Sequence, residues 1–107
     1  MHLAGFCDDE TGQGRGLGRK TMPETLRYSA VIAVHTLWLA ARARGLGLGW
    51  VSILDPAAAT ASLDVPESWT FIAYLCLGWP VEDHVEPELQ RLKWQSREAA
   101  CRQVLRR

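Results

Sequence analysis

The sequence lacks an excess of charge of either sign, and it lacks a long apolar run. Its 107 residues contain 12 Lys and Arg against 12 Asp and Glu. A chain without a basic excess has little of the counterion release that drives nucleic-acid binding, and no polybasic patch for an anionic membrane. The longest apolar stretch, residues 29–41, is shorter than the roughly 20 residues that a bilayer-spanning helix needs. We therefore expect neither nucleic acid nor a membrane among its partners.

Cysteine is scarce and scattered. Cys7, Cys76 and Cys101 form no Cys-x-x-Cys motif and no Cys/His pair at zinc-ligand spacing. Two of the three lie in apolar runs, where a free thiol behaves as a small hydrophobic group. The first residues also lack the basic segment and apolar run of a signal peptide. These absences predict no metal site and a cytoplasmic location, where thiols stay reduced.

A complete phosphate-binding glycine motif is also missing. Glycine occupies every second position from residue 12 to residue 18, just before a predicted helix. Arg19, however, stands where both the Walker loop and the dinucleotide-binding motif require glycine. We therefore predict a surface loop over residues 11–20. The alternative is a lid whose Arg15, Arg19 and Lys20 meet an anionic ligand.

The sequence does contain a long apolar helix between strand-like runs. Thr21 and Glu24 have the spacing of a capping box, and Gly45 suits a helix end, which predicts a central helix over about residues 21–44. Apolar residues occur on nearly every face of this helix, so we expect it to be buried on nearly all sides. The fold class predicted is α+β, with a sheet packed on this helix. The expected strands are residues 2–7, 46–54 and 70–77, a short helix opens at Asp55-Pro56, and residues 89–107 form a basic tail.

Few residues suggest chemistry on their own. Gly47 and Gly49 lead from the central helix into a strand, where glycine permits close approach of a flat ligand or of another backbone. Ser52 is a polar residue in that predicted strand, and it needs a partner if it is buried. His35 is either a core or interface histidine or a catalytic base. Arg97 belongs to the solvated tail, or it clamps a phosphate.

Several runs of the sequence together resemble a known family. They are Gly18–Ser29, Thr36–Ala43, Gly49–Pro56 and Ala73–Pro80. These runs are similar to the aerobic 5,6-dimethylbenzimidazole synthases, the BluB family of the nitroreductase-like flavoprotein superfamily. The resemblance covers essentially the whole chain but only the C-terminal half of the family. It implies that residues 1–107 are the C-terminal half of a nitroreductase-like FMN domain, and so a partial domain.

The resemblance implies a homodimer with FMN at the subunit interface. Reduced FMN is then a substrate that O2 fragments to give the lower ligand of vitamin B12, with NAD(P)H as the indirect electron source and a flavin reductase as supplier of FMNH2. Ser52 aligns with a serine near the flavin and is the predicted catalytic residue. Gly47, Gly49 and Arg97 join it as predicted cofactor-binding residues, with Arg97 on the phosphate. The family's arginine cluster and an aspartate needed for chemistry lie in its other half.

The sequence also allows other interpretations of the function. One alternative is an FMN-dependent NAD(P)H reductase or nitroreductase of the same superfamily, which regenerates its flavin. Another is a non-catalytic remnant, or a subunit that a separate N-terminal chain completes. Because the resemblance covers only half of the family's sequence, it does not imply that this chain is active by itself.

Overall fold

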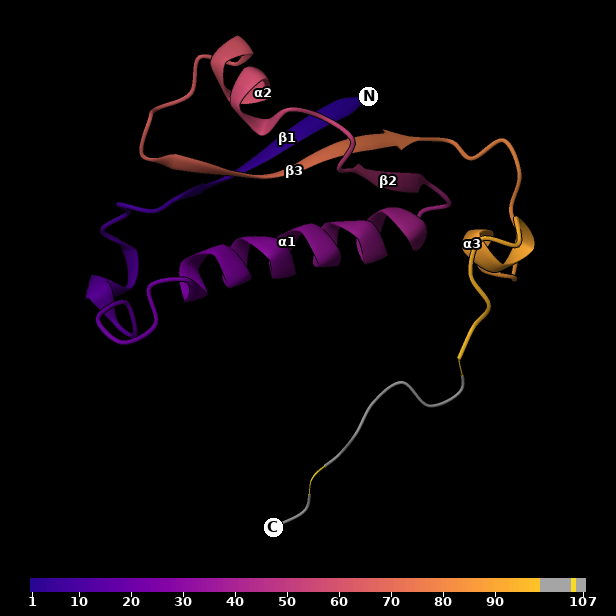
Figure 1. Ribbon diagram of the computed structural model, residues 1–107, viewed down its shortest axis with the longest axis horizontal. Coiled ribbons are helices and arrows are strands. Elements are labelled where there is room, and N and C mark those ends of the chain that lie inside the picture. Colours follow the sequence, from indigo (N-terminus) through magenta and orange to yellow (C-terminus); the bar gives the residue numbers. More distant parts are fainter. Residues whose placement is uncertain (99–104, 106–107) are drawn as a thin grey trace.

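The computed structural model describes residues 1–98 and 105, and it is an α+β structure. Figure 1 shows a small antiparallel sheet with helix α1 along one face and the short helix α2 on the other. This arrangement confirms the predicted class and the packing of the sheet on one long helix. The elements are β1 (His2–Asp8), the 3-10 helix η1 (Gln13–Gly16), α1 (Thr25–Arg42), β2 (Gly47–Val51), α2 (Pro56–Ser62), β3 (Trp69–Gly78) and α3 (Glu88–Arg91).

Strand β3 is the centre of the sheet, whose order is β1-β3-β2. It is the predicted strand 70–77 with one more residue at each end. In the β1–β3 register Gly5 lies opposite Ala73, and the next β1 residue, Phe6, lies opposite Phe71. The extra β3 residue, Ile72, forms a bulge that shifts the register. A bulge of this kind increases the local twist of the strand.

The core lies between α1 and β3. Ala73 is fully buried and Leu75 is 2% exposed, and both pack against Val34 and Ala41 of the helix. Leu48 of β2 completes this cluster of buried residues. Because Ala73 and Ala41 are small, the helix can approach the sheet closely at these points.

The start of α1 differs from the capping-box prediction. Thr21 does not cap the helix, because its hydroxyl donates to the Gly18 carbonyl at 3.1 Å, within a separate turn. The N-cap position falls on Glu24, which already has helical backbone angles and whose side chain caps nothing. The helix therefore begins at Thr25 rather than at residue 21. Its predicted glycine end is confirmed: Gly45 has φ +74°, and the Leu46 amide donates to the Ala41 carbonyl at 3.0 Å.

The prediction that α1 is buried on nearly all sides is wrong for the described chain. Only Val34 and Ala41 of this helix are buried. On the side away from the sheet, Ile32 is 64% exposed, Leu39 58% and Tyr28 53%. The physical reason is simple: one sheet face covers one side of a helix, and no other described element packs against the far side. The apolar composition of a helix indicates that its faces need to be buried, but it does not indicate which element buries them.

The short helix α2 forms as expected. The Asp55 carboxylate accepts hydrogen bonds from the Ala57 amide at 2.9 Å and the Ala58 amide at 3.3 Å, and Pro56 opens the first turn. None of the helices in the described part of the chain has the length and apolarity that a membrane crossing requires.

Candidate functional site

Ser52 lies just beyond the end of β2 and is exposed. The expected strand over residues 46–54 is therefore too long, and the prediction that Ser52 lies within it is wrong. Pairing with β3 stops at Val51, which lies opposite Tyr74, because the chain then turns toward the Asp55 cap of α2. The Ser52 hydroxyl is consequently available to a group outside the described chain.

The two candidate glycines of β2 have different surroundings. A Cβ at Gly47 would lie 3.6 Å from the Gly78 carbonyl oxygen and 3.7 Å from Pro80 Cβ, which are ordinary contacts. A Cβ at Gly49 would meet no atom within 4 Å. Because Leu48 is buried toward α1, alternation along the strand turns Gly49 to the opposite face. Gly49 therefore leaves open space beside the middle of the strand, three residues before Ser52.

Arg97 is placed away from this strand end. It is exposed, and it lines a groove of about 640 Å³ that residues 87–98 form among themselves. Figure 1 shows the segment after α3 running away from the sheet. The structure thus places Gly47 at the start of β2, Gly49 in its middle and Ser52 just beyond its end, and it leaves Arg97 apart from all three.

The glycine-rich loop is closed on itself. Gly14, Gly16 and Gly18 all have positive φ angles between 68° and 78°, which explains the choice of glycine at these positions. The Arg19 guanidinium donates to the Thr11 carbonyl at the other end of the loop. Arg19 is therefore occupied within the loop, and of the three cations only Arg15 and Lys20 are exposed.

His35 does not lie in the core. It is exposed on the outer side of α1, so the core interpretation of this histidine is wrong. Among the described residues, no group of three or more His, Cys, Asp or Glu side chains is placed to hold a metal ion.

A polar cluster that the sequence did not suggest joins three elements. The Arg27 guanidinium grips the Asp9 carboxylate, with Nη2–Oδ2 at 2.6 Å and Nε at 3.2 Å from both oxygens. The Thr70 hydroxyl donates to the same carboxylate at 2.5 Å. These hydrogen bonds hold the pKa of Asp9 at about 2, below its ordinary 3.8. The cluster fastens the first turn of α1 and the start of β3 to the segment after β1.

The buried thiol of Cys7 borders this cluster. Burial is the largest cause that raises the pKa of Cys7, and the neighbouring Asp9 carboxylate raises it further. The thiol therefore stays protonated and behaves as a small core group, as its apolar sequence context predicted. No spacing rule could have joined Asp9 to Arg27 and Thr70, because the fold alone brings them together.

We expect Asp9→Asn to lower the free energy of unfolding by about 1–2 kcal/mol near neutral pH, because it removes the charge-assisted bonds to Arg27. The folded-state pKa of Asp9 lies below its unfolded value, so this contribution is present above about pH 4 and is lost as the pH falls toward 2. Urea unfolding of both proteins across this pH range is the measurement.

The matched control is Glu10→Gln, the same chemical change at the neighbouring exposed acid, with an expected effect within about 0.5 kcal/mol. An Asp9→Asn deficit as large near pH 2 as near pH 7 would contradict the assigned role of the carboxylate charge.

Comparison with known proteins agrees with this architecture. The model of the nitroreductase family matches residues 4–79, the segment from β1 through β3. The chain belongs to the nitroreductase family.

Its similarity to curated members is high but partial. Over 97 residues it is 69% identical to a 5,6-dimethylbenzimidazole synthase of Rhodospirillum rubrum, covering 91% of this chain and 46% of that protein. It is 50% identical over 95 residues to a 5,6-dimethylbenzimidazole synthase of Rhodobacter capsulatus, covering 89% of this chain and 46% of the relative. The chain thus spans about half the length of the curated relatives that it matches. It is a homologue of these synthases over that half, as the sequence resemblance indicated.

Proposed function

We propose that this nitroreductase-family chain serves the synthesis of 5,6-dimethylbenzimidazole, the lower ligand of vitamin B12, by oxidative fragmentation of reduced FMN with O2. The observation that carries the proposal is the 69% identity to a 5,6-dimethylbenzimidazole synthase over 91% of the chain. A match over 97 of the 107 residues spans the run Gly49–Pro56 around the candidate site. Reduced FMN supplies the electrons and the carbon skeleton of the benzimidazole. A flavin reductase that uses NAD(P)H provides the reduced FMN.

We infer that one edge of the flavin ring lies against the segment from Gly49 to Ser52. The open side of Gly49 leaves room for a flat ligand against the strand, and the exposed Ser52 hydroxyl can donate a hydrogen bond to a ring heteroatom. A donor that a bound flavin holds against its ring stabilises charge that develops there during the reaction. Gly47 leaves less room for a ligand than Gly49 does, because Gly78 and Pro80 lie beside it.

The segment from Gly49 to Ser52 offers no charged group for the phosphate of FMN. Arg97 stays a prediction for that role, and its place in the groove of residues 87–98 gives it no support. We propose that a homodimer with FMN at the subunit interface supplies the remaining contacts. The exposed apolar side of α1 supports the homodimer, because a surface of that kind calls for a partner.

The test is to supply the purified chain with FMNH2 and O2 and to measure benzimidazole and flavin together. The reaction is run with the chain alone and after adding, as a separate polypeptide, the part of the Rhodospirillum rubrum relative that lies outside the match. We expect benzimidazole to form as flavin disappears in at least one of the two conditions. Ser52→Ala should lower its rate by about tenfold or more while flavin binding, read by visible absorbance after desalting, persists.

The matched control is Ser62→Ala, the same change at an exposed serine that ends α2. NAD(P)H oxidation with full recovery of FMN and no benzimidazole would replace the proposal with the reductase alternative. If flavin retention and product were both absent in the two conditions alike, the non-catalytic alternative would replace the proposal.

A further inference from the structure

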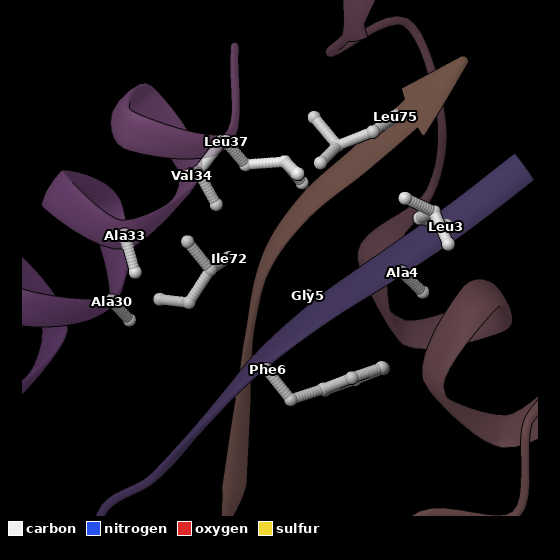
Figure 2. Close-up of a pocket in the computed structure, with 10 residues that line it drawn as sticks. All are labelled: Leu3, Ala4, Gly5, Phe6, Ala30, Ala33, Val34, Leu37, Ile72 and Leu75. Atoms are coloured by element: carbon white, nitrogen blue, oxygen red, sulfur yellow. The ribbon is translucent and has the colours of Figure 1, made fainter. Parts of the chain in front are cut away.

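A thiol and an imidazole lie together on the face of the sheet opposite α1. In the β1–β3 register His2 lies opposite Cys76, and the Cys76 sulfur is 3.5 Å from His2 Nδ1. Their sequence neighbours Leu3 and Leu75 line the apolar groove of about 360 Å³ between α1 and β1, as Figure 2 shows. Because side chains alternate along a strand, His2 and Cys76 project from the other face. The pair is therefore separate from both the groove and the core.

The imidazole of this pair is held in position. Its ring stacks on the ring of Tyr74, with the two centroids 5.6 Å apart and the planes 27° from parallel. His2 lies on β1 and Tyr74 on β3, so the pairing of these strands keeps the two rings together. In this position Nδ1 of His2 can accept the proton of the Cys76 thiol. A nitrogen base beside a thiol is the arrangement that activates cysteine as a nucleophile.

The Cys76 thiol is open to small molecules. Cys76 is half-buried and His2 is exposed. On the side away from His2, the residue directly opposite Cys76 is Gly49 of β2. A Cβ at Gly49 would meet no atom within 4 Å, so the described chain leaves space beside the thiol. A small electrophile can therefore approach the sulfur from this side.

The other described cysteine has the opposite surroundings. Cys7 is only 7% exposed, and burial together with the Asp9 carboxylate raises its pKa. A buried thiol beside an anion reacts slowly, whereas an accessible thiol beside a base reacts fast. Cys7 is thus an internal reference for the reactivity of Cys76 in the same chain.

We propose that Cys76, with His2 as its base, is a modification site that hydrogen peroxide oxidises to the sulfenic acid. The sulfur attacks one peroxide oxygen and the O–O bond breaks. The thiol proton passes through His2 Nδ1 to the leaving oxygen, which departs as water. Cysteine is oxidised, and one peroxide is reduced. The inference goes beyond the proposed function and does not depend on it, although O2 that takes two electrons from reduced flavin would supply the peroxide.

The first test adds hydrogen peroxide to the purified chain near neutral pH and traps sulfenic acid with dimedone. Mass spectrometry of the digested chain reports each cysteine separately. We expect trapping at Cys76 to be about tenfold faster than at Cys7, or more. A rate at Cys76 that does not exceed the rate at Cys7 would overturn the inference. Because peroxide is added directly and no flavin is present, this result is independent of whether the chain forms a benzimidazole.

The second test separates the action of the base from simple exposure of the thiol. His2→Phe keeps an aromatic ring beside Tyr74 but cannot accept a proton, and His2→Gln keeps a polar side chain without a basic nitrogen. Both variants should slow the oxidation of Cys76 by about fivefold or more, with an unchanged rate at Cys7 and equal far-UV circular dichroism. The matched control is His84→Phe, the same change at an exposed histidine after β3, which should leave the rate unchanged. Oxidation of Cys76 at the unaltered rate in both His2 variants would show that exposure alone explains its reactivity, and the inference would be wrong.

Discussion

Leu75→Ala is expected to lower the free energy of unfolding by about 2–4 kcal/mol. Leu75 is 2% exposed, and it lies on the central strand β3 opposite Leu3 of β1 and Trp50 of β2. It therefore contacts all the layers that hold the structure together, since it also belongs to the cluster beneath α1. Alanine removes the buried side chain and leaves a cavity that the paired strands on both sides cannot collapse to fill.

Urea unfolding followed by far-UV circular dichroism measures this loss. Leu17→Ala is the matched control, because Leu17 is 91% exposed in the glycine-rich loop, and its expected effect is within about 0.5 kcal/mol. A loss below about 1 kcal/mol for Leu75→Ala would mean that the interface between α1 and β3 is loosely packed. The position of the core described above would then be wrong.

Much of the secondary structure could be predicted from local sequence, because local chemistry determines it. The Gly45 end of α1 and the Asp55-Pro56 start of α2 depend on backbone groups within a few residues, and both form as expected. The apolar run that became β3 was recognisable because a central strand is covered on both edges. The capping box failed where two local solutions competed, since Thr21 bonds to Gly18 instead of to the helix.

The features that could not be predicted depend on distant parts of the chain. Arg27 and Thr70 meet at Asp9 only because β1, α1 and β3 come together at one corner of the fold. The end of β2 depends on where β3 stops pairing, and that moved Ser52 out of the strand and into solvent. The exposed side of α1 likewise depends on how much of the helix one small sheet can cover.

The candidate site shows the same division. The Gly47–Ser52 segment was recognised as a unit because its glycine spacing and its serine are contiguous, and the structure distributes it along β2, with Gly47 first and Ser52 just after the strand. Arg97 was joined to them only through resemblance, and a position dozens of residues away has no local geometry to hold it there. A contiguous motif is therefore a better basis for predicting a site than a single charged residue far away in the sequence.

Ala73→Leu overpacks the core, whereas Leu75→Ala leaves a cavity in it. We expect Ala73→Leu to lower the free energy of unfolding by about 2–3 kcal/mol. Ala73 is fully buried, and a Cβ built on Gly5 opposite it would lie 3.8 Å from both the Ala73 Cβ and the Val34 Cγ2. A larger side chain at position 73 must therefore push α1 away from the sheet.

The matched control for this overpacking is Ala58→Leu, which makes the same change on the exposed surface of α2. It should change the free energy of unfolding by no more than about 0.5 kcal/mol, because leucine and alanine are both good helix formers. If Ala73→Leu were as mild as this control, the sheet and α1 would have room between them that Gly5, Ala73 and Val34 do not show. The small residues of β1 and β3 would then reflect something other than close packing of the helix.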